Sequence, residues 1–129
     1  MIFVDTNYFL RFLLADVSLQ HEEAKRLFQQ AAKGEIRLFT STIVFFELYW
    51  VLTSFYQKSK PQIIKILKDI LLLGFIKIEE REILEKALAK FQKTNLELED
   101  CYNLTYACQK GAEKIATFDK KLIKNQSHS

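Results

Sequence analysis

The stretch IFVDTNYFLRFLL, residues 2–14, begins with three apolar residues, meets an acid at Asp5 and then continues in a helical pattern. A short apolar run bounded by polar residues is typical of a buried strand, and TNYFLRFLL, residues 6–14, reads as a helix. The stretch therefore predicts a strand over residues 2–4, an acid at its end and a helix directly after it. This is the first half of a βαβ unit.

Three more short apolar runs repeat this pattern along the chain: IRLF (36–39), FIKI (75–78) and KIAT (114–117). Helical segments separate them. Strands that alternate with helices predict an α/β fold in three α/β/α layers, with a short central parallel sheet of about four strands flanked by helices. With 129 residues, one proline, three glycines and no linker, the chain is expected to form a single domain over residues 1–129.

Capping residues mark the expected helix starts, because Ser, Thr, Asp and Asn side chains can accept hydrogen bonds from the first backbone N–H groups. The expected starts are Ser18, Ser41, Ser59 and either Glu99 or Asp100, with a last helical turn in KKLIK (120–124).

Composition narrows the class of protein. The net charge of +3 permits a polyanionic partner without requiring one. Cys101 and Cys108 are about 10 Å apart in one expected helix, which is beyond disulfide reach, and reduced thiols suit the cytoplasm. Residues 38–56 imitate a membrane span, but a carboxylate at their centre, Glu47, is disfavoured there by about 3 kcal/mol. No signal-peptide pattern is found, so a cytoplasmic protein without a membrane role is expected.

Four acids are expected to meet at one edge of the sheet. Asp5 directly follows the first strand, and Asp119 follows the fourth after one residue. Ligands of parallel α/β sheets bind outside the carboxyl ends of the strands, where these two acids would lie. Asp100 opens a helix on the same rim. Glu47 projects from VFFELYWVL (44–52), a helix that is otherwise apolar.

Each acid also has an ordinary structural explanation. Asp5 and Asp100 suit helix starts, and Asp119 suits the cap of the final turn. Glu47 is harder to explain, because its own helix offers no lysine or arginine. A salt bridge to a distant lysine is the alternative for this residue.

Four like charges in one crevice would repel one another, and a bound divalent cation removes that repulsion. All-oxygen ligands select a hard cation, so Mg²⁺ or Mn²⁺ is expected. Zinc fits poorly, because His21 and His128 are isolated and the two cysteines lack CxxC spacing. Such a cation activates bound water and stabilises charge on phosphoryl oxygens, which is the chemistry of phosphodiester hydrolysis.

The constellation of VDTNYFLRFL (4–13), TSTIVFFELYWVL (40–52), LEDCYNLTYACQKG (98–111) and IATFDKKL (115–122) resembles the PIN-domain family. Within it, the chain looks most like the VapC-type toxin ribonucleases of bacterial and archaeal toxin–antitoxin pairs. The resemblance implies a PIN fold, Mg²⁺- or Mn²⁺-dependent endoribonuclease activity and inhibition by a small antitoxin protein.

The resemblance also assigns roles to individual residues. The catalytic and metal-binding acids are Asp5, Glu47, Asp100 and Asp119, and the residues that support the acids or position water are Asn7, Thr117 and Asn103. Arg11, Lys120 and Lys121 are candidate contacts for RNA phosphates, with ordinary solvated surface as the alternative. Many relatives continue to a final strand, so the ending KKLIKNQSHS (120–129) implies that a fifth strand is absent or very short.

Other functions are weighed against the nuclease. A haloacid-dehalogenase-type phosphatase needs a second acid where this chain has Asn7, and no P-loop motif is present. The alternative from a different class is a catalytically weak or inactive PIN-like module that binds RNA or protein. The apolar segments LYWVLTSFY (48–56) and IIKILKDILLL (63–73) predict a homodimer, with the antitoxin laid over the remaining groove.

Overall fold

The sheet has three parallel strands in the order β1 (Ile2–Phe3), β2 (Leu38–Thr40) and β3 (Ile76–Ile78). Its register pairs Ile2 with Leu38 and Leu38 with Ile76. Each crossover between parallel strands contains helices, as βαβ units require. The α/β class expected from the alternating pattern is therefore confirmed.

The computed structural model describes residues 1–126, so His128 lies outside the described residues. These residues form two units, one from Met1 to Glu79 and one that begins at Glu80, and each unit is described by itself. The expectation of a single domain stays a prediction.

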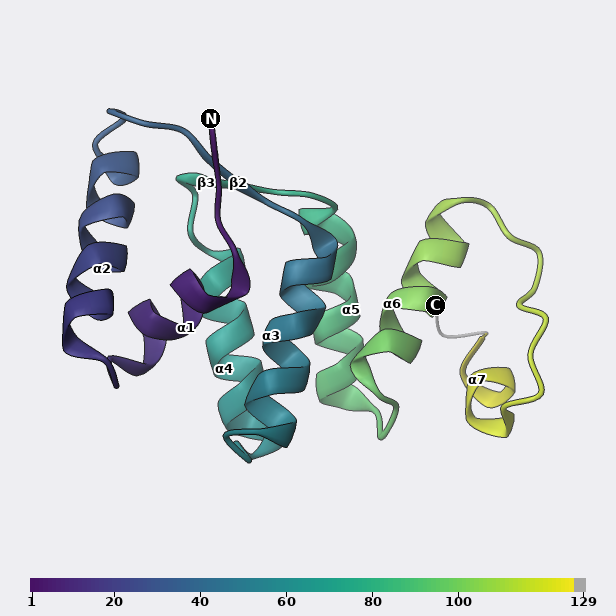
Figure 1. The fold of residues 1–129 in the computed structure, drawn as a ribbon. Helices are drawn as coiled ribbons and strands as arrows, with labels where there is room; N and C mark the ends of the chain where they lie inside the picture. The colour runs from purple at the N-terminus through teal and green to yellow at the C-terminus, as the bar shows by residue number, and fades with distance from the viewer. Residues whose placement is uncertain (127–129) are drawn as a thin grey trace. The chain divides into compact units, whose positions relative to one another are not determined.

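The first unit contains the sheet and four helices: α1 (Thr6–Leu14), α2 (Ser18–Ala32), α3 (Thr42–Ser54) and α4 (Lys60–Leu71). Helix α1 packs on α2 and α3, and α3 packs on α4 (Figure 1). Aromatic rings fill the space around α2, where Phe28 contacts Phe9, Phe12 and Phe75 at centroid distances of 5.7, 4.8 and 5.8 Å. The buried core of this unit combines aromatic residues such as Phe9 and Phe28 with aliphatic side chains from the sheet, α3 and α4.

Two of the expected caps are present. The Ser41 hydroxyl accepts a hydrogen bond from the Val44 N–H at the start of α3, and Ser59 forms a reciprocal capping box with Gln62 at the start of α4. The third expectation is wrong by one residue, because Val17 occupies the N-cap position of α2 and makes no side-chain cap bond.

The second unit is helical in the residues that the structure describes: α5 (Arg81–Lys93), α6 (Leu98–Gln109) and the short α7 (Lys120–Asn125). Helices α5 and α6 pack against each other. Their facing residues include Leu84, Ala87, Leu98 and Leu104, all fully buried.

The predicted fourth strand over residues 114–117 is wrong: this segment is irregular, and the described sheet has three strands instead of about four. The Ile115 N–H donates to Gln126 Oε1 at 2.9 Å, and the Gln126 amide N–H₂ donates back to the Ile115 carbonyl at 3.4 Å. A side-chain amide therefore satisfies the backbone groups that a strand would offer to a neighbouring strand.

A buried threonine hydroxyl extends the β1–β2 pairing beyond the last strand residue. The Val4 N–H donates to the Phe39 carbonyl at 2.9 Å, and the Thr40 hydroxyl donates to the Val4 carbonyl at 2.8 Å. Both groups of Val4 are thus held by β2, and Thr40 is only 5% exposed. This arrangement fixes the backbone immediately before Asp5.

None of the helices in residues 1–126 is long and apolar enough to cross a membrane.

Thr40→Val is predicted to lower the free energy of unfolding by about 1–3 kcal/mol, because it leaves the buried Val4 carbonyl without its donor while keeping the side-chain shape. Urea unfolding followed by circular dichroism measures the change. Thr53→Val is the matched control, because the Thr53 hydroxyl bonds only the Tyr49 carbonyl of its own helix, and its effect should stay within about 0.5 kcal/mol. Equal effects of the two substitutions would contradict a special role for Thr40.

Candidate active site

Asp5 stands between β1 and α1, where the strand ends and the helix begins. It occupies the N-cap position of α1 in extended conformation, yet its side chain makes no capping hydrogen bond. Within residues 1–126 the carboxylate also forms no ion pair. The Asp5 side chain therefore does not act as a helix cap, and its carboxylate remains available to a ligand.

The neighbouring Thr6 adds an unusual feature. Its side chain is 6% exposed, and its hydroxyl has no hydrogen-bond partner among the described residues. An unsatisfied buried hydroxyl costs free energy, so the Thr6 hydroxyl needs a partner such as a water molecule or a ligand.

The Glu47 side chain on α3 is half-buried. The helix buries Val44, Phe45, Leu48 and Leu52, whereas Ile43 and Trp50 on the side of Glu47 are 63% and 45% exposed. No salt bridge to a lysine is found for Glu47 in the described part of the chain. The distant-lysine explanation is therefore not supported. Partial exposure lets water solvate the charge, so Glu47 is less isolated than its apolar sequence neighbours suggest.

Asp100 and Asp119 belong to the second unit and both serve helix starts. Asp100 stands in the first turn of α6, whose N-cap is Glu97. Asp119 is the N-cap of α7, and its Oδ1 accepts hydrogen bonds from the N–H groups of Lys121 at 2.8 Å and Leu122 at 3.4 Å. The expected start of α6 at Glu99 or Asp100 is wrong by one or two residues, because the helix begins at Leu98. Asp119 acts as a helix cap, which is its ordinary structural explanation.

Burial raises the pKa of Asp100, and the negative charges of Asp119, Glu99 and Glu97 raise it further. A hydrogen bond from the Glu97 backbone acts in the opposite direction. The two acids that the sequence separates by a loop thus lie close enough within this unit for one charge to destabilise the other.

The donor set fits a hard divalent cation, because all four predicted ligands are carboxylates and two of them repel each other. The structure brings Asp100 and Asp119 near each other in one unit, while Asp5 and Glu47 belong to the other unit. Within residues 1–126 there is no group of three or more His, Cys, Asp or Glu side chains that could hold a metal ion. The four-acid cluster stays a prediction.

The predicted supporting residues occupy distinct positions. The Thr117 hydroxyl accepts a hydrogen bond from the Asp119 N–H at 3.0 Å, so it orients the backbone of this acid directly. Asn7 is exposed in the first turn of α1, and Asn103 is exposed on α6 one helical turn after Asp100. Lys120 and Lys121 are exposed at the start of α7, as a contact with phosphate would require.

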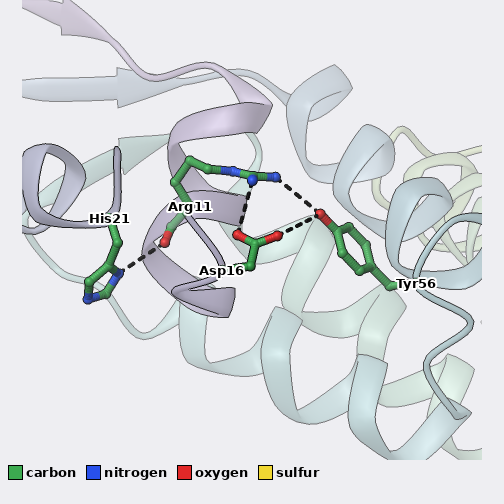
Figure 2. A network of polar contacts seen from close by, with 4 residues as sticks. All are labelled: Arg11, Asp16, His21 and Tyr56. Carbon is green, nitrogen blue, oxygen red and sulfur yellow. Dashed lines mark hydrogen bonds and ion pairs between the residues drawn. The ribbon is translucent and has the colours of Figure 1, made fainter. Parts of the chain in front are cut away.

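Arg11 is engaged within the protein. Its guanidinium forms an ion pair with Asp16 at 3.0 Å and donates a hydrogen bond to the Tyr56 hydroxyl at 3.1 Å (Figure 2). The side chain is only 18% exposed, and the Tyr56 hydroxyl also donates to Asp16 at 3.4 Å. This network joins α1 to the segment after α3. The phosphate contact expected for Arg11 stays a prediction, with a positive charge that Asp16 already neutralises.

Thr40, Thr6 and Tyr56 are missed by reading the sequence for acids and cations. The expected strand over residues 36–39 ended one residue before Thr40, whereas β2 includes it. A threonine hydroxyl directly after an apolar run was the signal in the sequence that could have identified Thr40. The remaining two depend on contacts between distant segments, which no local pattern encodes.

Asp100→Asn is predicted to raise the melting temperature of the metal-free protein at pH 7, on the order of 2 °C. A raised carboxyl pKa means that ionisation costs stability as pH rises through the folded-state pKa of Asp100, and the effect vanishes below the ordinary value of 3.8. Thermal melts in chelator at pH 7 and pH 3 measure both limits. Glu85→Gln, an exposed acid of α5, should show no gain. A lower melting temperature for Asp100→Asn at pH 7 would contradict the assignment.

Comparison with known protein families gives one match, which is the PIN domain over residues 2–126. Neither a curated protein nor a solved structure matches the chain significantly. PIN domains are generally metal-dependent nucleases. The match spans both units and all four acids, and the chain belongs to the PIN domain family.

Proposed function

We propose that this protein is a Mg²⁺- or Mn²⁺-dependent endoribonuclease and the VapC-like toxin component of a type II toxin–antitoxin pair. The observation that carries the proposal is the state of Asp5. Its backbone is fixed by β2 through Val4, it stands at the carboxyl end of a parallel strand, and its carboxylate serves no cap or ion pair among residues 1–126. An acid that is held in place without a structural task is suited to bind a ligand.

Asp5, Glu47, Asp100 and Asp119 would hold the cation. When bound, the cation supplies a water of lowered pKa and stabilises negative charge on the phosphoryl oxygens. The chain itself positions the ligands: Thr40 holds the backbone before Asp5, and Thr117 together with the turns of α7 holds Asp119. The exposed Lys120 and Lys121 offer positive charge for neighbouring RNA phosphates.

The partners of this function are an RNA substrate, an antitoxin protein and a second copy of the chain, in the cytoplasm. Exposed apolar side chains in the first unit support a protein partner, with Phe55 75% exposed and Leu72 70% exposed. Reduced Cys101 and Cys108 are consistent with the cytoplasm.

A catalytically weak or inactive PIN-like module is the second candidate. One observation favours it: Asp119 already accepts two backbone hydrogen bonds, so this acid has a structural reason to be present without catalysis. The same argument does not extend to Asp5.

Glu47→Gln is predicted to reduce RNA cleavage on the order of 100-fold or more, because it removes a charged ligand of the cation while keeping the side-chain shape. Cleavage of a total RNA sample by purified protein, with Mg²⁺ or Mn²⁺ and with chelator, measures the effect, and circular dichroism checks the fold. Glu35→Gln, an exposed acid after α2, is the matched control and should leave cleavage unchanged.

Cleavage that persists in chelator, or that Glu47→Gln leaves intact, would contradict the metal mechanism. An unfolded Glu47→Gln variant would show instead that this carboxylate stabilises the fold.

We predict that the protein is a homodimer at micromolar concentration. Light scattering should then give about twice the 15.2 kDa mass of one chain. If Phe55 lies in that interface, Phe55→Lys should shift the protein towards monomer, because a charge would be buried without a partner. Leu19→Lys, at a residue that is 84% exposed on α2, serves as the control. A monomer at this concentration for the unmodified chain would contradict the dimer.

A further inference from the structure

A pocket of about 370 Å³ lies in the first unit, directly beside the first acidic motif. Its lining residues are Asn7, Tyr8, Arg11, Gln20 and Glu23. Helix α1 supplies the first three and the amino-terminal half of α2 supplies the other two. Because Asn7 follows Asp5 by two residues, the pocket and this acid belong to one continuous stretch of backbone. The volume is at the lower end of the range for small-molecule sites, roughly 300–1,000 Å³.

One lining residue of this pocket, Arg11, belongs to the network in Figure 2. The Arg11 side chain is fixed by Asp16 on one side and Tyr56 on the other. The His21 Nδ1–H donates to the Arg11 carbonyl at 3.0 Å, which ties α2 to α1 within the two lining helices, since a carbonyl can only accept. His21 also stacks on Phe12 at a centroid distance of 6.2 Å. The Arg11 side chain and the pairing of the two lining helices are therefore fixed by contacts within the protein, whereas Asn7, Gln20 and Glu23 are exposed.

The pocket presents polar groups whose hydrogen-bonding capacity the described chain does not use. In residues 1–126 the side chains of Asn7, Gln20 and Glu23 form no hydrogen bond or ion pair with other residues. Two amides and one carboxylate can form hydrogen bonds with a ligand that carries both donors and acceptors along one edge. The half-buried Tyr8 adds an aromatic face to the same wall. This combination matches a planar heterocycle with a hydrogen-bonding edge.

The charges of the pocket argue against a phosphate in it. Asp16 already neutralises the guanidinium of Arg11, and the carboxylate of Glu23 would repel an anion. A carboxylate accepts hydrogen bonds only, so it requires a donor on the ligand. Among the RNA bases, cytosine, adenine and guanine offer the hydrogens of an exocyclic amino group. Uracil offers only its N3–H, which lies between two carbonyl oxygens that a carboxylate repels.

We propose that this pocket binds one unpaired nucleobase with an exocyclic amino group, next to the phosphodiester that is cleaved at Asp5. The base stacks on Tyr8, Glu23 accepts its amino hydrogen, and Gln20 reads the remaining edge. The inference rests on the proposed ribonuclease function and adds to it a preference for the base beside the cut.

A binding experiment tests the pocket without cleavage. Full-length protein that carries Asp5→Asn is titrated, in Mg²⁺, into fluorescein-labelled RNA hexanucleotides of cytidine, adenosine or uridine. Cytidine or adenosine RNA should bind roughly tenfold more tightly than uridine RNA. Adding Glu23→Gln should remove this preference, because an amide can also donate to the uracil carbonyl. Tyr8→Leu should weaken binding of all three by about fivefold or more.

Glu22→Gln is the matched control, because Glu22 is an exposed acid of the same helix that does not line the pocket. It removes the same charge and should leave the base preference intact. Equal preferences in Glu23→Gln and Glu22→Gln, or no measurable binding of any of the three RNAs, would overturn the proposal. An oligoarginine peptide that loses affinity with Glu23→Gln while the RNA preference is unchanged would assign the pocket to a cationic protein segment and also overturn it.

A cleavage experiment separates this proposal from the ribonuclease function. Sequencing of cleaved RNA ends, with Asp5 intact, should show an amino-bearing base beside the cut, and Glu23→Gln should relax that preference about tenfold. Cleavage whose base preference Glu23→Gln leaves unchanged would overturn the pocket and leave the nuclease standing. Absence of cleavage together with a base preference that Glu23→Gln removes in the binding experiment would support the pocket and contradict the nuclease.

Discussion

The hydrogen bond from the buried Thr40 hydroxyl to the Val4 carbonyl is the contact on which the first unit depends. β1 contributes only Ile2 and Phe3 to the sheet, and strands of this length are held weakly by backbone pairing alone. The Thr40 bond carries the β1–β2 pairing one residue beyond the last strand position. Val4 is the last residue before Asp5, so this hydrogen bond fixes the backbone from which α1 leaves the sheet. The positions of Asp5, of Asn7 and of the pocket lining on α1 depend on this point.

The sequence predicted much of the fold because its local patterns agree with the tertiary structure. Ser41 and Ser59 act as caps where expected, and the three strands of the sheet lie within one or two residues of their predicted positions. The segment 114–117 failed for a physical reason. A run of this length has too little periodicity to separate a strand from an irregular segment, and the side chain of Gln126 competes for its backbone groups. That competitor is eleven residues away from Ile115 and leaves no local signal.

The identity of the acids could be read from the sequence, but their use could not. Asp5 and Asp119 both occupy N-cap positions, and only Asp119 makes the capping bonds. The difference depends on the backbone angles and rotamers at each turn, which are set by the neighbouring structure. Arg11 shows the same limit: its position one turn after Asn7 suggested a phosphate contact, whereas Asp16 and Tyr56 occupy its guanidinium. Residue type indicates what a side chain can do, and its neighbours decide what it does.

Three of the four predicted ligands stand at helix starts. Asp5 precedes α1, Asp100 stands in the first turn of α6 and Asp119 caps α7. At the starts of the longer helices α1 and α6, the positive end of the helix dipole favours a carboxylate by about 0.3–1 kcal/mol. For Asp100 this offsets part of the repulsion from the neighbouring acids of its own unit. The two backbone hydrogen bonds that Asp119 Oδ1 accepts would compete with a metal, because they occupy lone pairs that coordination needs. Glu47, in the middle of α3, has neither the benefit nor the competition. It is therefore the acid whose side chain has the least structural reason to be retained.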